Sequence, residues 1–142
     1  MGEVAHYLDA SFLVALLVSD PLTSLAAKFA GDSLNSPIVS NLTGAEFASA
    51  ISRRVRIGEF NLQQARTALS TFDDWMEAKR WVEVQSADFA SATSFVRQFD
   101  LKLRTPDALH LAVVQRIGAT LVTFDVGMTA AARMLFIPVA DL

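Results

Sequence analysis

The sequence predicts an α/β protein: a three-layer α/β/α sandwich with a central parallel sheet of about five strands. Short segments of β-branched and aromatic residues alternate with longer segments of helical periodicity. This alternation is typical of a parallel sheet covered by helices on both faces. The 142 residues contain no repeat, linker or low-complexity tract, and this length suits one compact fold. We therefore expect residues 1–142 to form a single domain.

The expected strands are short apolar segments bounded by polar or turn-forming residues. They are Val4–Leu8, Pro37–Ser40, Trp81–Val84, Thr120–Phe124 and Phe136–Val139. The expected helices have apolar residues at spacings of three and four. They are Ser11–Val18, Leu22–Ala30, Gly44–Ile57, Leu62–Lys79, Ala87–Phe99, Pro106–Ile117 and a short one at Thr129–Leu135.

Proline and glycine support several of these helix boundaries. Pro21 and Pro106 stand at predicted starts, where the missing backbone N–H removes no hydrogen bond. Gly58 and Gly118 stand where helices are expected to stop. Residues 108–114 are apolar on nearly every side, so their helix is expected to be central and buried.

Composition narrows the possible functions. There are no cysteines, which excludes disulfides, thiolate metal sites and cysteine nucleophiles. The net charge is -3, so any nucleic-acid binding must depend on a local arrangement of charge. The apolar run from Phe12 to Val18 is too short to span a bilayer, and it follows Glu3 and Asp9 rather than basic residues, unlike a signal peptide. We expect a cytoplasmic protein with no membrane contact. Its 52% hydrophobic content leaves apolar surface for a partner or a second copy.

Four acids stand where ligands bind in open α/β sheets, beyond the carboxyl ends of the strands. Asp9 ends the first predicted strand, and Asp125 ends the strand that begins at Thr120. Glu46 opens the helix after Pro37–Ser40, and Asp107 lies in the first turn of the central helix. If the sheet is parallel and these helices begin at one edge, the four carboxylates converge there.

Each acid also has a purely structural interpretation. Asp9 and Asp125 can cap the helices that follow them, Asp107 can complement a helix dipole, and Thr43-Gly-Ala-Glu46 fits a capping box. Asp20 and Asp88 are internal controls, because they too look like helix-start acids but follow no β-type segment. The whole set favours a site: four acids with no Lys or Arg beside them repel one another unless a cation lies between them.

Oxygen ligands without cysteine favour a hard divalent ion, either Mg²⁺ or Mn²⁺. Such an ion keeps bound waters, lowers the pKa of one of them and stabilises the charge that develops when a phosphodiester is hydrolysed. We therefore expect Asp9, Glu46, Asp107 and Asp125 to be both catalytic residues and metal ligands.

Four segments resemble the motifs of PIN-domain nucleases, and their order and spacing resemble the VapC-type toxins of bacterial toxin–antitoxin pairs. The segments are Tyr7-Leu-Asp9-Ala-Ser11, Thr43-Gly-Ala-Glu46-Phe47, Arg104-Thr-Pro-Asp107-Ala-Leu-His-Leu-Ala112 and Leu121-Val-Thr123-Phe-Asp125. The similarity spans nearly the whole chain, and the third segment is the most specific. It implies Mg²⁺-dependent endoribonuclease activity, an RNA substrate, a homodimer and an inhibiting antitoxin. Ser11 and Thr123 match positions where the family places hydroxyls near the acids.

The chain departs from this pattern after Asp125. Many relatives have a further polar or acidic residue just downstream, whereas this chain continues Val126-Gly-Met128. The departure favours one metal ion over two.

The remaining polar and aromatic residues allow two interpretations each. Arg53, Arg54, Arg56, Lys102 and Arg104 are candidates for RNA backbone contacts, or form an ordinary solvated face. His110 can act as a general base, but a histidine in a buried helix is more often a hydrogen-bonded core residue, and His6 is expected to be structural. Trp75 and Trp81 can stack on bases, or cover the end of the core.

Two other functional classes compete with a nuclease. An Asp-based phosphoacceptor domain also places an aspartate after its first strand. However, the dehalogenase type needs a second Asp where Ser11 stands, and none of Lys28, Lys79 and Lys102 suits a receiver domain. A catalytically silent interaction module with the same fold is the other alternative. A dinucleotide-binding domain is excluded because no glycine-rich turn follows any strand.

Overall fold

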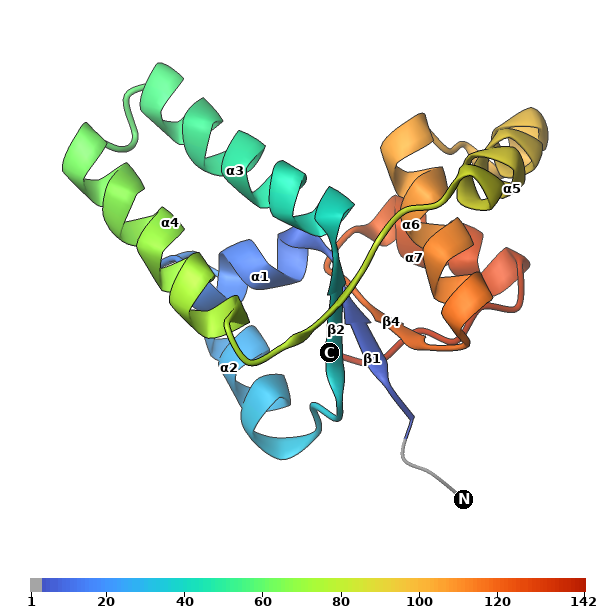
Figure 1. Ribbon diagram of the computed structural model, residues 1–142, viewed down its shortest axis with the longest axis horizontal. Helices are drawn as coiled ribbons and strands as arrows, with labels where there is room; N and C mark the ends of the chain where they lie inside the picture. Colours follow the sequence, from blue (N-terminus) through green and yellow to red (C-terminus); the bar gives the residue numbers. More distant parts are fainter. Residues whose placement is uncertain (1–3) are drawn as a thin grey trace.

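The computed structural model describes residues 4–142 as a parallel sheet between two layers of helices (Figure 1). The strands are β1 (His6–Leu8), β2 (Pro37–Ser40), β3 (Arg80–Val82) and β4 (Thr120–Val122). They pair in parallel in the order β3-β2-β1-β4. The predicted α/β/α sandwich is confirmed. β1 lies in the interior of the sheet, so its carboxyl end has a strand on each side.

Consecutive residues of the strands face opposite helix layers, as the pleat of a strand requires. Leu8, Val39 and Val122 pack into one hydrophobic cluster with the helices of the first layer. That layer consists of α1 (Ala10–Leu17), α2 (Thr23–Asp32), α3 (Asn41–Arg56) and α4 (Leu62–Met76).

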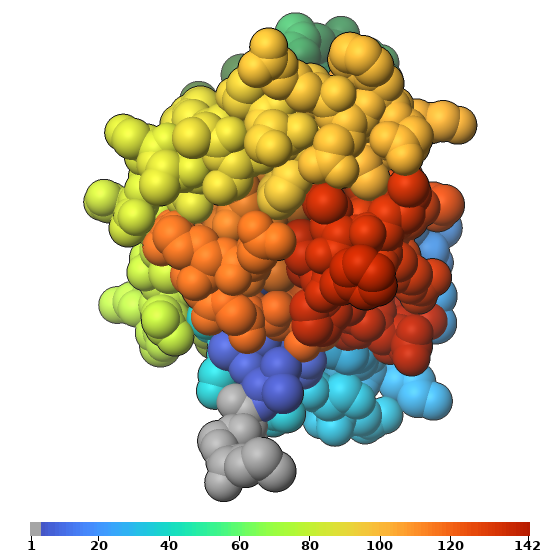
Figure 2. Space-filling model, turned by 90° about the vertical axis from the view of Figure 1, so that its right-hand side faces the viewer, coloured from blue at the N-terminus to red at the C-terminus, as the bar shows by residue number. Residues whose placement is uncertain are grey.

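The neighbours Tyr7, Ile38 and Leu121 belong to a second hydrophobic cluster on the other face of the sheet. It is covered by α5 (Ser86–Arg97), the 3₁₀ turn Phe99–Leu101, α6 (Thr105–Ile117) and α7 (Val126–Met134). Figure 2 shows this side of the molecule, with the segments from α5 to the C-terminus forming most of its surface.

Helix α6 is the centre of the second layer, as predicted. Every residue from 108 to 114 is buried, including His110. The helix ends at Gly118, whose φ of 67° is the left-handed conformation that glycine adopts without strain. Its Arg116 binds the buried Asp88 of α5 through Nε (2.8 Å) and Nη2 (3.0 Å), which joins the two helices by an ion pair.

The predicted fifth strand, Phe136–Val139, is present only as one isolated bridge between Val139 and Leu121. Pro138 has no N–H to donate, and Phe136 has a φ of 58°, which breaks the extended conformation. The sheet therefore has four strands, and the C-terminal segment contributes two backbone hydrogen bonds with Leu121.

Other differences are shifts of element ends. The third strand is Arg80–Val82 rather than Trp81–Val84, and α3 begins at Asn41 rather than Gly44 because Ser40 caps it by accepting a hydrogen bond from Thr43 N–H. Helix α2 begins at Thr23, so Pro21 lies just before the helix. In residues 4–142, no helix has the length and apolar character needed to cross a membrane.

Candidate active site

The sheet edge at the carboxyl ends of β1 and β4 carries two of the predicted acids. Asp9 directly follows β1 and caps α1, accepting a hydrogen bond from Phe12 N–H at 3.1 Å. Asp125 follows the end of β4 and caps α7, accepting from Met128 N–H at 2.8 Å. Because β1 and β4 are paired in parallel, both caps lie at the same edge of the sheet. The capping interpretation is thus correct for both residues, and it places both of them where a ligand would bind.

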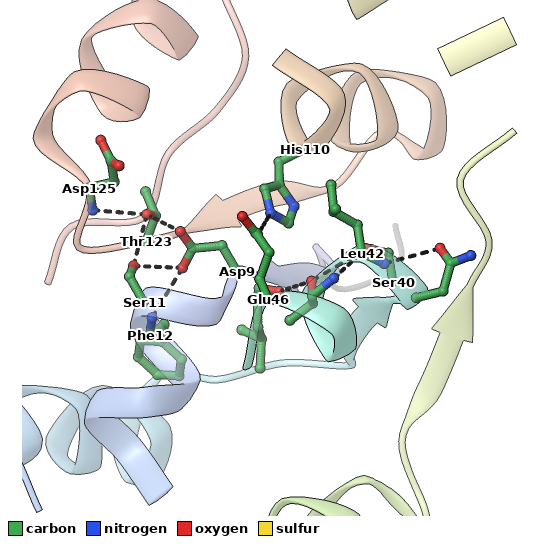
Figure 3. A network of polar contacts seen from close by, with 12 residues as sticks. Asp9, Ser11, Phe12, Ser40, Leu42, Glu46, His110, Thr123 and Asp125 are labelled. Carbon is green, nitrogen blue, oxygen red and sulfur yellow. Dashed lines mark hydrogen bonds and ion pairs between the residues drawn. The ribbon is translucent and has the colours of Figure 1, made fainter. Parts of the chain in front are cut away.

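Asp9 is buried to 3% exposure and is held only by neutral donors. Thr123 Oγ1 donates to its Oδ2 at 2.6 Å, and Ser11 Oγ donates to its Oδ1 at 2.8 Å (Figure 3). Burial raises the pKa of Asp9, and the hydrogen bonds from Thr123, Phe12 N–H and Ser11 offset part of that rise. The carboxylate is therefore fixed in orientation without a cation among its donors.

The two hydroxyls also connect Asp9 to the segment that carries Asp125. Ser11 Oγ accepts from Phe124 N–H, and Thr123 Oγ1 accepts from Asp125 N–H, both at 2.9 Å. The placement of Ser11 and Thr123 beside the acids agrees with the sequence prediction. The carboxylate of Asp125 itself points away from Asp9 in Figure 3.

Glu46 lies in the second turn of α3, one turn further into the helix than predicted, because α3 begins at Asn41. Its capping interpretation is wrong: Ser40 is the N-cap. The Glu46 carboxylate instead reaches across to α6, where Oε1 binds His110 Nε2. In Figure 3 it lies between Asp9 and the His110 ring.

His110 belongs to a buried polar network that the sequence analysis did not identify. Its Nδ1 lies 2.6 Å from the hydroxyl of Tyr7, which in turn lies 2.7 Å from Ser40 Oγ. Thr43 Oγ1 contacts the same Tyr7 hydroxyl at 3.4 Å and donates to Leu8 O at 3.0 Å. The one sequence signal for this network was a tyrosine and a histidine in otherwise apolar buried segments. The prediction that His110 is a hydrogen-bonded core residue is confirmed.

Asp107 occupies the first turn of α6 and is partly buried. Its pKa is raised by burial, and next by the negative charges of Asp125 and Glu46; His110 and Arg104 counteract this in part. These causes show that Asp107 lies within electrostatic reach of two other predicted acids. They also correct the expectation that no Lys or Arg accompanies the set, because Arg104 acts on Asp107.

The four acids lie at one edge of the sheet, but their carboxylates do not converge on a common point. Within residues 4–142, no three His, Asp or Glu side chains are arranged closely enough to hold a metal ion in this conformation. The donor chemistry nevertheless fits a hard cation, since all four residues carry carboxylate oxygens, the ligands that such an ion prefers. Assignment of the four acids as metal ligands stays a prediction.

The two control aspartates have structural partners. Asp88 binds Arg116, and Asp20 binds Arg54 Nη2 at 3.4 Å and Leu22 N–H at 2.7 Å. Of the predicted RNA-contacting residues, Arg54 is therefore engaged, and its guanidinium also lies over the Phe60 ring at 5.3 Å. Arg56 donates to Ser52 Oγ at 2.7 Å.

Trp75 lies in the last turn of α4, and Trp81 lies in β3. Trp75 belongs to the edge of the first-layer cluster and stacks with Lys79, whose Nζ is 4.5 Å from the ring centre. Trp81 meets Phe72 edge-on and stands against Gly44, where an added Cβ would lie 3.3 Å from the indole. These contacts agree with the core-covering interpretation.

A pocket of about 420 Å³ opens directly beside the acids. Ser11, Asp20 and Asp125 are its polar lining residues, and the rest of the lining is apolar. Its lining residues are Ala10, Ser11, Val14, Asp20, Leu22, Ala50, Phe124 and Asp125. Phe124 stacks on Phe12, with ring centroids 5.9 Å apart and ring planes at 19°.

The fold and this edge define the class of protein. The family model described as the PIN domain matches residues 6–134, so the chain belongs to the PIN-domain family. The family resemblance seen in the four sequence motifs is thereby confirmed. A comparison with curated protein sequences found no match.

Solved structures of toxins and toxin–antitoxin complexes share this fold. VapC20 of Mycobacterium tuberculosis, described as a toxin that cleaves the sarcin–ricin loop, has a TM-score of 0.74 and 21% identity over 89% of this chain and 95% of that chain. VapBC2 of Rickettsia felis, bound to a promoter DNA fragment, has a TM-score of 0.69 and 14% identity over 97% and 98%. VapBC-1 of nontypeable Haemophilus influenzae has a TM-score of 0.66 and 15% identity over 96% and 97%. At these identities the likeness establishes a common fold.

Proposed function

We propose that the protein is a Mg²⁺-dependent endoribonuclease and the toxin of a type II toxin–antitoxin pair. Asp9, Glu46, Asp107 and Asp125 are its metal-binding and catalytic carboxylates, and Mn²⁺ can replace Mg²⁺. One observation supports the proposal: Asp9 and Asp125 follow paired parallel strands, and Glu46 and Asp107 lie in the first two turns of α3 and α6, two helices joined by the contact of Glu46 with His110. Such an arrangement lowers folding stability unless a cation is bound, so a binding function explains it best.

The metal would supply an activated water and stabilise the negative charge of the reacting phosphate. The residues of the chain have separate roles in this proposal. Ser11 and Thr123 fix both oxygens of Asp9, so this carboxylate is oriented before a ligand arrives. Glu46 and Asp125 are more exposed than Asp9, so an ion could reach their carboxylates from solvent. The departure at Val126–Met128 favours a single ion.

The substrate is RNA, in a single-stranded or looped region. Carboxylates alone repel a phosphate, and a bound divalent ion reverses the local charge. Arg53, Lys102 and Arg104 are the candidates for backbone contacts, whereas Arg54 and Arg56 are already engaged within α3 and its neighbours.

The antitoxin would cover the acids and the pocket beside them. The apolar lining of the 420 Å³ pocket suits an apolar side chain, and Asp125 in the same lining suits a cationic one. Relatives of this fold have been solved as toxin–antitoxin complexes. We also propose that the protein is a cytoplasmic homodimer. The exposed apolar side chains Phe99 (85%), Val126 (84%) and Phe136 (93%) provide surface for a second copy.

The test is RNA cleavage by the purified protein with and without divalent ions. EDTA should abolish cleavage, Mg²⁺ or Mn²⁺ should restore it, and Ca²⁺ should restore it poorly. Cleavage that survives exhaustive chelation would contradict the metal mechanism. A protein that binds Mn²⁺ but cleaves no RNA would favour a silent interaction module, and retention of phosphate from a phosphoryl donor would favour the phosphoacceptor alternative.

Expression in the host tests the toxin assignment separately. The free protein should arrest growth, and co-expression with the protein of the adjoining gene should relieve the arrest. Normal growth during unrestrained expression of the active protein would contradict the toxin assignment.

A further inference from the structure

Glu46 is held in place by a histidine that is itself held by a tyrosine. His110 is 1% exposed, and both of its ring nitrogens are occupied, Nε2 by Glu46 and Nδ1 by the Tyr7 hydroxyl at 2.6 Å. We propose that Tyr7 and His110 are positioning residues for Glu46, so that the affinity of the site for a divalent ion depends on the Tyr7 hydroxyl. This inference rests on the proposed metal-dependent function.

The direction of the contact with Glu46 follows from the chemistry of the two groups. An ionised carboxylate only accepts hydrogen bonds, so His110 Nε2 must carry the donated proton. Rotation of the ring would break the bonds at both nitrogens and leave buried polar atoms without partners. Such atoms are absent from the described side chains of residues 4–142. The ring is also fixed by an edge-on contact with Tyr7, with centroids 5.6 Å apart and planes at 63°.

Tyr7 connects three segments of the chain, namely the strand it belongs to and two segments that its hydroxyl contacts. Its own residue lies in β1, while its hydroxyl meets Ser40 Oγ of β2 at 2.7 Å and Thr43 Oγ1 of α3 at 3.4 Å. Ser40 is in turn fixed as the N-cap of α3, the helix that carries Glu46. The hydrogen bonds of this network therefore connect α6 with β1, β2 and α3. The contact of Glu46 with His110 joins α3 to α6 a second time.

The consequence concerns the free oxygen of Glu46. A glutamate side chain that is 33% exposed has several rotamers available when nothing holds it. The bond from His110 to Oε1 selects one orientation and leaves Oε2 available to a ligand. Because neither nitrogen of His110 is free and its ring is buried, the geometry favours a positioning role over that of a general base.

The first test is Tyr7→Phe, which removes one oxygen and keeps the ring. Mn²⁺ binding measured by calorimetry on the full-length protein should weaken by about 10- to 100-fold. The matched control is Thr23→Val, which removes a hydroxyl that donates to Ala15 O (2.7 Å) near the end of α1 remote from Asp9. The control should bind Mn²⁺ like the wild type even where it lowers the melting temperature.

Two substitutions at His110 test the roles of its two ring nitrogens separately. In His110→Gln the side-chain amide occupies the place of Nε2 and can still donate to Glu46, whereas in His110→Asn it occupies the place of Nδ1 and reaches only Tyr7. The glutamine variant should therefore keep more Mn²⁺ affinity than the asparagine variant. Equal loss in both, with both proteins folded, would contradict the positioning role.

Kinetics on RNA provide a readout that a general loss of stability does not change. At limiting Mn²⁺, Tyr7→Phe should lower kcat with little change in KM, and saturating Mn²⁺ should restore much of kcat. Wild-type protein that neither binds Mn²⁺ nor cleaves RNA would refute the proposed function. Wild-type protein that does both, with Tyr7→Phe and His110→Asn indistinguishable from it, would refute this inference alone.

Discussion

Two aspartates at the starts of helices are almost fully buried: Asp9 is 3% exposed and Asp88 is 2% exposed. Asp88, in the first turn of α5, receives two hydrogen bonds from Arg116 and one from Gln85 N–H. Burial raises its pKa, but these bonds and the charge of Arg116 outweigh burial and lower the pKa overall. Asp9 receives hydrogen bonds from neutral groups, and its pKa is raised.

The difference between the two aspartates lies in how the charge of each is compensated. Arg116 compensates Asp88 within the fold, so Asp88 needs nothing from outside. Asp9 has its orientation fixed by Ser11 and Thr123 while its charge is left without such a partner. An oriented, uncompensated carboxylate is what a cation-binding site requires, and it lowers stability in the absence of the cation.

The largest expected effect is on catalysis at Asp107, the proposed ligand whose pKa is raised by burial and next by its acidic neighbours. Asp107→Asn should lower RNA cleavage by about 10²-fold or more, because one metal ligand is lost. Its stability in EDTA should be equal to or above that of the wild type, because repulsion is relieved. Thermal melts with and without Mg²⁺ should show less stabilisation by Mg²⁺ in the mutant.

The capping interpretation of Asp107 predicts the reverse pattern. A carboxylate that only complements the helix dipole would cost about 0.3–1 kcal/mol of stability on removal and leave cleavage unchanged. An Asp107→Asn protein that melts lower in EDTA and cuts RNA normally would remove Asp107 from the site.

Removing the ion-pair partner of Asp88 should lower the stability of the protein rather than its activity. Arg116→Met leaves Asp88 buried without its cation, and the free energy of unfolding should fall by about 3 kcal/mol, the lower end for buried pairs because Arg116 is 29% exposed. Urea denaturation measures this loss. The double variant Arg116→Met with Asp88→Asn should recover part of it, because no buried charge remains, and failure to recover would show that the guanidinium acts mainly by packing.

Lowering the pH should reduce the stability that the ion pair of Asp88 with Arg116 contributes. The folded-state pKa of Asp88 is lowered relative to the unfolded chain, so the pair stabilises the protein fully above about pH 4, the unfolded value, and less as the pH falls through the folded pKa. The stability difference between wild type and Asp88→Asn should therefore shrink below about pH 4. Melting temperatures measured across pH 2.5–7 for the two proteins test this, and a difference independent of pH would contradict the ion-pair account.

The smallest effect is expected at Asp20, whose side chain is 20% exposed whereas that of Asp88 is 2% exposed. Its pair with Arg54 has side chains that are each 20% exposed, so Asp20→Asn should cost about 0.2–1 kcal/mol, less at high salt. Urea denaturation at low and high ionic strength measures it. A cost as large as that of Arg116→Met would show that exposure does not separate the two pairs.

The sequence predicts the arrangement of strands and helices well because local patterns set it. The range Pro37–Ser40 is confirmed without change, since Pro37 begins the strand and Ser40 caps the next helix. The strand at Phe136–Val139 was wrong because its apolar pattern does not reveal a left-handed φ at Phe136, which also leaves that ring 93% exposed. Such a conformation follows from how the segment after α7 returns to the sheet.

The site was only partly predictable for the same reason. The positions of Asp9 and Asp125 follow from topology, because parallel strands end at a common edge. The contact of Glu46 with His110 joins residues 64 positions apart, and the contact of Tyr7 with His110 joins residues 103 positions apart. No periodicity encodes such contacts, since they depend on how α3 and α6 pack against opposite faces of the sheet.

The pairing of β1 with β4 has a consequence for the protein during its own synthesis. Asp9 is held by Thr123, which is 114 residues later in the chain, so the first strand has no β4 beside it until most of the protein has been translated. A nascent chain still short of β4 can build the α1–α4 layer from local contacts but lacks the Thr123 hydrogen bond that fixes Oδ2 of Asp9. The carboxylate edge is therefore assembled last, once β4 has left the exit tunnel of the ribosome.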